Sequence, residues 1–139
     1  MDKKICIAID AMGGENAPFK NIEGINLFYQ KNKGVNDYLF NIFGDEQKIN
    51  IELKKYNIPN NNFKIFHTPS VVSDNETPLT AVKTSKNSSM WNSVYSQTKS
   101  ESDISLSAGN TGVLLVISRM ILKTINGVSK PALAGLWPN

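Results

Sequence analysis

The chain has 139 residues, of which 40% are hydrophobic and 19% are charged. This length gives room for one domain with one core, and the composition is that of a globular chain rather than a disordered or fibrous one. Fifteen Lys and Arg residues against twelve Asp and Glu residues leave a formal net charge of +3. Because this excess is small and forms no long run of like charge, the sequence does not favour nucleic-acid binding.

The first part of the chain is predicted to be a strand, a glycine turn and a helix. Residues 4–10 form a short apolar run rich in isoleucine, which is typical of a strand buried on both faces. The run stops at Met12-Gly13-Gly14. From Ala17 onward the apolar residues recur with a helical period, and residues 32–34 offer a C-terminal stop.

The same alternation continues to the end of the chain. Further strands are predicted at residues 38–43, 63–66, 104–106 and 132–137, and helices at 46–56, from Pro78 onward and at 113–125. Serine and asparagine are poor residues for a helix interior, so we expect a break or a new helix start near Asn87.

Strands that alternate with helices predict right-handed βαβ units and a parallel sheet. The expected fold class is therefore α/β, with three layers in a Rossmann-like arrangement. A mainly parallel sheet of about five strands would carry helices on both faces. No linker or repeat divides the chain, so a single α/β domain is expected over residues 1–139.

The loops after the strands hold the candidate site, because ligands of an open parallel sheet bind beyond the carboxyl ends of its strands. The first loop runs from Asp10 to Asn16. The backbone amides of Gly13 and Gly14 can approach a phosphate closely, just before a helix N-terminus. On the local pattern alone, an ordinary tight turn in which Asp10 and Asn16 cap backbone groups explains this loop equally well.

Two other segments offer similar donors. The loop from Ser107 to Gly112 contains two glycines, two hydroxyls and an amide, which suits either an anion cradle or a plain helix cap. Lys86 would place a positive charge beside a helix start at Ser88 and Ser89, although a solvated lysine and a simple cap are the commoner explanation.

Several other chemistries lack the residues they need. With one histidine, His67, and one cysteine, Cys6, a Cys/His zinc site and an internal disulfide are both excluded, and no metal site is predicted. The nucleotide-binding and nucleophile-elbow glycine motifs are absent from the sequence. No apolar segment has the length of a membrane span, and nothing indicates an oxidising compartment, so a cytoplasmic location is expected.

Four blocks occur in a recognisable order. They are residues 7–18, with Asp10-Ala11-Met12-Gly13-Gly14 at their centre, then Lys86-Asn87-Ser88-Ser89-Met90, then Ser107 to Gly112, then Lys130-Pro131-Ala132. Together they resemble the PlsX family, the phosphate acyltransferases of bacterial phospholipid synthesis. Members of that family are longer, which implies that residues 1–139 are the N-terminal portion of a longer acyltransferase.

The resemblance implies that a fatty acyl group is transferred from acyl carrier protein to inorganic phosphate, giving acyl phosphate, with no cofactor. The candidate catalytic residues are Lys86, which would neutralise developing negative charge, and Asn110. The candidate phosphate or substrate ligands are Asp10, Gly13, Gly14, Asn16, Ser88, Ser89, Ser107, Gly109, Thr111 and Gly112.

The implied partners are acyl carrier protein and inorganic phosphate, with a homodimer and peripheral contact with the membrane in the longer protein, and no nucleic acid. Two alternatives stay open. One is an acyl transfer to phosphate from coenzyme A, as in phosphotransacetylases. The other is a non-catalytic α/β module that binds a phosphorylated small molecule or a partner.

Overall fold

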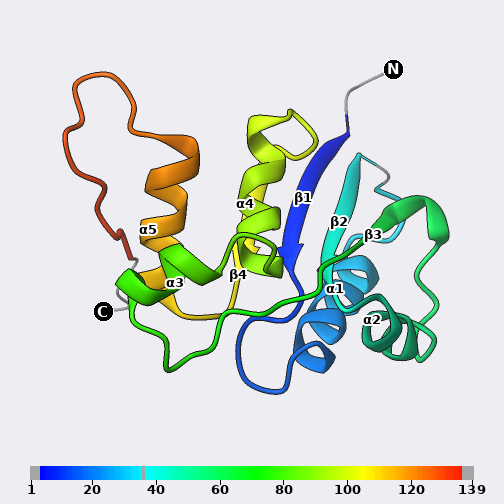
Figure 1. The fold of residues 1–139 in the computed structure, drawn as a ribbon. Helices are drawn as coiled ribbons and strands as arrows, with labels where there is room; N and C mark the ends of the chain where they lie inside the picture. Colours follow the sequence, from blue (N-terminus) through cyan, green and yellow to red (C-terminus); the bar gives the residue numbers. More distant parts are fainter. Residues whose placement is uncertain (1–3, 36, 136–139) are drawn as a thin grey trace.

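A parallel sheet forms the centre of the computed structural model, which describes residues 4–35 and 37–135. Within these residues the sheet has four strands in the order β3-β2-β1-β4. The strands are β1 (Ile5–Asp10), β2 (Tyr38–Gly44), β3 (Phe63–His67) and β4 (Ile104–Ser107). All three pairings are parallel, so the carboxyl ends of the strands share one edge (Figure 1).

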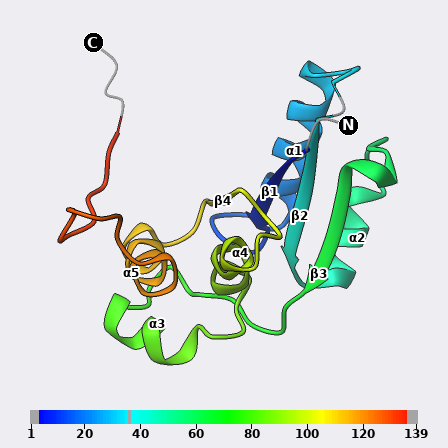
Figure 2. The same cartoon turned by 90° about the horizontal axis from the view of Figure 1, so that it is seen from above.

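Helices lie on both faces of this sheet (Figure 2). One face carries α1 (Phe19–Lys31) and α2 (Glu46–Leu53), and a short 3-10 turn, η1 (Asn60–Asn62), precedes β3. The other face carries α4 (Ser89–Thr98), which contacts β1, β2 and β4. Farther from the sheet, α5 (Thr111–Leu122) packs on α4, and α3 (Pro78–Thr84) packs on α5.

The face under α1 and α2 is a conventional apolar core. Alternate residues of the two central strands point into it, and the helices contribute residues at a helical spacing. Its fully buried members include Ile22 of α1, Ile42 of β2 and Ile49 of α2. The apolar periodicity in the sequence thus fixes which side of α1 and α2 faces the sheet.

The face under α4 is built from small and polar residues instead. Three serines of α4, Ser89, Ser93 and Ser96, are buried along one side of the helix. The Ser105 hydroxyl of β4 donates a hydrogen bond of 2.8 Å to the Ser93 carbonyl oxygen. Small side chains let the helix lie close to the strands, which explains how a serine-rich segment forms a buried helix.

The fold class expected from the sequence is confirmed, since the sheet is parallel and helices cover both faces. The expected break is also present, because α3 ends at Thr84 and α4 begins at Ser89. The predicted fifth strand is wrong for residues 132–135, which have no strand structure, while 136 and 137 lie outside the described residues. An apolar run needs a partner edge to become a strand, and local sequence does not supply one.

Candidate functional site

The sheet reverses its strand order between β1 and β4. The chain passes from β1 to β2 to β3 in one direction, and β4 then pairs on the other side of β1. In open α/β sheets, the crevice at such a switch point, beyond the carboxyl ends of the strands, is where ligands bind. The two glycine loops predicted from the sequence follow these two strands, so the structure brings them together at this place.

Glycine is required where the loops touch. A Cβ on Gly13 would lie 2.5 Å from Asp10 Oδ2 and 2.9 Å from both the Gly109 amide nitrogen and Ser107 Oγ. Gly14 has a φ of +87°, and a Cβ there would lie 2.7 Å from the Ala108 carbonyl oxygen. The first loop therefore packs backbone to backbone against the second, which any side chain would prevent.

The buried side chain of Asp10 links the two loops through hydrogen bonds. Its carboxyl is 1% exposed, and Oδ2 accepts a 2.7 Å hydrogen bond from the Ser107 hydroxyl. Oδ1 accepts a weaker bond of 3.3 Å from the Met12 amide. Burial raises the pKa of the Asp10 carboxyl above its ordinary value of 3.8, against the opposite effect of the surrounding hydroxyl and amide groups.

Asn21 holds the first loop from the side, a role that the sequence analysis did not assign. Its Nδ2 donates to the carbonyl oxygens of Ala11 and Gly13, both at 2.9 Å. The signal for this role in the sequence was the position of Asn21 in the first turn of α1. Asparagine on a helix surface rarely holds a neighbouring loop through hydrogen bonds, so the position alone did not indicate it. Asn16, a candidate phosphate or substrate ligand from the sequence, is exposed, and its side chain has no hydrogen bond to the described residues.

The two serines at the start of α4 have different surroundings. Ser88 is the N-cap, since its hydroxyl accepts a 3.1 Å hydrogen bond from the Trp91 amide. The Ser89 hydroxyl lies beside the Asp10 carboxyl and is fully buried, with no hydrogen-bond partner of good geometry among the described residues. Both serines are buried, so neither faces solvent.

The Asn110 side chain links the second loop to the segment before α3 through hydrogen bonds. Its Oδ1 caps α5 by accepting a 3.1 Å bond from the Val113 amide. Its Nδ2 donates to the carbonyl oxygens of Asp74 and Glu76, both at 3.0 Å. Both polar ends of the side chain are thus engaged within the fold.

The start of α5 adds further solvent-facing groups at this edge. Thr111 is exposed, and its hydroxyl has no hydrogen bond to the described residues. The backbone amides of Thr111 and Gly112 open the helix and have no acceptor in the described part of the chain, as is usual for the first turn of a helix. Lys86 is exposed and makes no ion pair within residues 4–35 and 37–135.

Other chemistry-bearing residues have structural positions. His67 Nδ1 accepts a 3.3 Å bond from the Glu46 amide at the start of α2. Among the described residues there is no cluster of three His, Cys, Asp or Glu side chains suited to a metal ion. Of the helices described, none combines the length and apolarity needed to cross a membrane.

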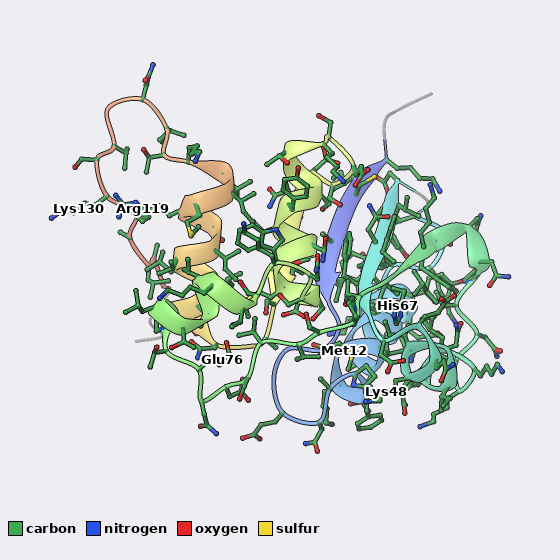
Figure 3. The ribbon with its side chains drawn as sticks, viewed as in Figure 1. Met12, Lys48, His67, Glu76, Arg119 and Lys130 are labelled. Atoms are coloured by element: carbon green, nitrogen blue, oxygen red, sulfur yellow. The ribbon has the colours of Figure 1, made fainter. Side chains whose placement is uncertain are left out.

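The excess of positive charge comes from the last part of the sequence. Residues 1–103 hold twelve cationic and twelve acidic side chains, so the net charge of +3 belongs wholly to residues 104–139. That region contains Arg119, Lys123 and Lys130 and no acidic residue. Figure 3 shows Arg119 and Lys130 on the side of the molecule formed by α5 and the segment after it.

Known proteins resemble this chain over its whole length. Residues 5–139 match the family described as "Fatty acid synthesis protein". A relative from Pelagibacter ubique (strain HTCC1062), named "Phosphate acyltransferase", is 47% identical over 139 residues, which are 100% of this chain and 40% of the relative. Two proteins of the same name, from Magnetococcus marinus and Bradyrhizobium diazoefficiens, are 39% and 37% identical over 95% and 99% of this chain, and 37% and 38% of their own lengths.

The chain therefore spans about 40% of the length of the curated relatives it matches. The match over residues 5–139 includes both glycine loops, the double serine and Asn110. On this evidence, the chain belongs to the fatty acid synthesis protein family.

Proposed function

We propose that this chain holds the phosphate-binding part of a phosphate acyltransferase, which transfers a fatty acyl group from acyl carrier protein to inorganic phosphate. One observation carries the proposal: two glycine loops meet at the switch point of the sheet, beside amides at the start of α5 that have no acceptor among the described residues. Support comes from the relatives, which are named phosphate acyltransferases.

The reaction needs positioning and charge stabilisation more than an enzyme nucleophile. A phosphate oxygen attacks the carbonyl carbon of the thioester, a C–O bond forms, and the C–S bond then breaks. The sulfur leaves as a thiolate and takes up a proton from the phosphate or from solvent, which gives acyl phosphate and the free carrier protein thiol. Fixed hydrogen-bond donors and a cation lower the barrier to such a step.

We assign the candidate residues to two groups, those that would act on phosphate and those that would hold the loops. Thr111 and Gly112 would contact phosphate directly through a hydroxyl and backbone amides, together with Gly14 of the facing loop. Lys86, which is exposed, would supply the positive charge. Asp10, Gly13, Ser88, Ser89, Ser107 and Gly109 would hold the loops in place from beneath, and Asn110 would fix the start of α5.

The test is an assay of free thiol and acyl phosphate from long-chain acyl carrier protein and phosphate. This assay compares the 139-residue chain with the product of the whole reading frame. Sedimentation without vesicles tests the expected homodimer, and sedimentation with vesicles tests the expected peripheral contact with the membrane. Thr111→Val should raise the KM for phosphate at least about tenfold, because a hydrogen bond to a charged ligand is lost. Thr124→Val, the same change at an exposed threonine of the far segment, should leave KM unchanged.

The assay also separates the alternatives. Phosphate-dependent thiol release from acyl coenzyme A, but not from the carrier protein, would favour the coenzyme A reaction. Phosphate binding by both proteins, seen by calorimetry, without thiol release from either donor would favour the non-catalytic module. Equal KM values for Thr111→Val and wild type would remove Thr111 from the phosphate site.

A further inference from the structure

The sequence contains one Asn-Gly pair, Asn126-Gly127, in the segment that follows α5. Both residues are exposed, and the segment extends away from the packed helices (Figure 1). A turn encloses the pair, because the Val128 amide donates a 3.1 Å hydrogen bond to the Ile125 carbonyl oxygen. Gly127 has a φ of +84°, which glycine adopts without strain. The turn therefore favours glycine directly after Asn126.

The polar groups of this pair are open to reaction. Neither the side-chain amide of Asn126 nor the backbone amide of Gly127 has a hydrogen-bond partner within residues 4–35 and 37–135. A Cβ at Gly127 would meet no atom within 4 Å, so open space surrounds this part of the backbone. Gly127 also has no side chain that could shield its nitrogen. This nitrogen can therefore approach Cγ, the carbonyl carbon of the Asn126 side chain.

Asn87 is a contrasting asparagine that is also exposed. It is followed by Ser88, which is 1% exposed and whose amide donates a 2.8 Å hydrogen bond to the Ser85 carbonyl oxygen. The nitrogen after Asn87 is thus held by the fold and lies beside a side chain. Exposure alone does not distinguish Asn126 from Asn87, but the free amide and the glycine that follow Asn126 do.

We infer that Asn126 is a site of spontaneous deamidation in the folded protein, since asparagine is a chemically labile residue. The Gly127 nitrogen attacks Cγ of Asn126 and loses its proton. A C–N bond forms, the bond between Cγ and the side-chain nitrogen breaks, and that nitrogen leaves with the proton as ammonia. Water then opens the resulting cyclic imide at either carbonyl carbon, which gives aspartate or isoaspartate.

The product changes the charge of the last part of the chain. Residues 104–139 hold three cationic side chains and no acidic one, so deamidation places the first acidic side chain there and lowers the formal net charge of +3 by one. Isoaspartate also routes the backbone through the former side chain, which alters the turn. The modification is therefore a slow, one-way change in both charge and backbone between Lys123 and Lys130.

Peptide mapping of the product of the whole reading frame tests this site. The protein is incubated at neutral pH, either folded or unfolded in guanidinium chloride, and then digested with trypsin. Mass spectrometry of the peptide that begins at Thr124 gives the rate at Asn126. Folded and unfolded rates at Asn126 should agree within about threefold, whereas folding should slow Asn87 at least about tenfold, equivalent to about 1.4 kcal/mol of added barrier. An isoaspartate methyltransferase should label the Thr124 peptide after incubation.

A matched pair of variants tests the part played by glycine. Gly127→Ala hinders the attacking nitrogen and should slow deamidation of Asn126 at least about tenfold. Gly135→Ala adds the same methyl group at a glycine whose Cβ also meets open space, and should leave the rate unchanged. The inference is wrong if folding slows Asn126 by about tenfold or more, if folded Asn126 reacts no faster than Asn87, or if Gly127→Ala reacts as fast as wild type.

Discussion

Ser107 donates a 2.7 Å hydrogen bond to Asp10, and the two residues are also direct partners at the ends of β4 and β1. They are 97 positions apart in the chain. The same carboxyl accepts the Met12 amide, so a single buried side chain holds both glycine loops at the switch point. Substitutions around this pair should therefore affect both loops together.

The first prediction concerns the pH dependence that Asp10 gives to stability. Its pKa in the folded protein lies above the ordinary value of 3.8, so the folded state holds this proton more tightly than the unfolded chain. The contribution of Asp10 is present at low pH and is lost as pH rises through the interval between the two pKa values. Asp10→Asn cannot titrate and should lack this dependence.

Urea unfolding of wild type and Asp10→Asn, repeated from about pH 4 to about pH 7, measures this effect. The stability of wild type relative to the variant should fall with rising pH and then level off. Ser107→Ala removes a hydrogen bond that favours the ionised carboxyl, so it should widen the interval. A constant difference between wild type and Asp10→Asn at every pH would contradict the assignment.

Gly13→Ala should destabilise the protein by about 1–3 kcal/mol, because its Cβ would overlap Asp10 and the second loop. Gly24→Ala is the matched control. It places the same methyl group in open space within α1, and should stabilise the protein by about 0.5–1 kcal/mol through helix propensity. Chemical unfolding of the two variants should give changes of opposite sign, and a loss of stability in Gly24→Ala would count against this description of the two sites.

The adjacent serines at the start of α4 should respond differently to alanine. Ser88→Ala loses the N-cap of the helix and should cost about 1 kcal/mol. Ser89→Ala removes a buried hydroxyl without a well-formed hydrogen bond, so stability should change by less than about 0.5 kcal/mol. Equal losses, measured by urea unfolding, would contradict the assignment of the Ser89 hydroxyl as poorly hydrogen-bonded.

Two substitutions at Asn110 should distinguish its two structural roles. Asn110→Asp keeps the oxygen that caps Val113 but loses the amide that contacts Asp74 and Glu76, whereas Asn110→Ala loses both. Hydrogen exchange followed by NMR should show a faster Val113 amide only in Asn110→Ala. Residues 74–76 should become more mobile in both variants. If that segment stays protected in Asn110→Asp, the hydrogen bonds from Asn110 Nδ2 do not hold it in place.

Much of this arrangement could be predicted from local sequence. The isoleucine run before Met12 fixed β1, the spacing of Ile22 and Ile25 fixed the buried side of α1, and Pro78 marked the first residue of α3. These signals are local, because strand and helix periods and turn residues act over a few positions. The order of glycine loops and serine pair also identified the family, which the comparisons confirm.

Tertiary structure decided which of these residues meet. Asp10 and Ser107 come together only because β4 crosses back to pair with β1, and the burial that raises the pKa of Asp10 follows from that crossing. The same packing engages Asn110 with residues 74–76 and gives Asn21, overlooked in the sequence, its hold on the first loop. Such contacts join positions far apart in the chain, so their geometry depends on how the layers pack and not on local preference.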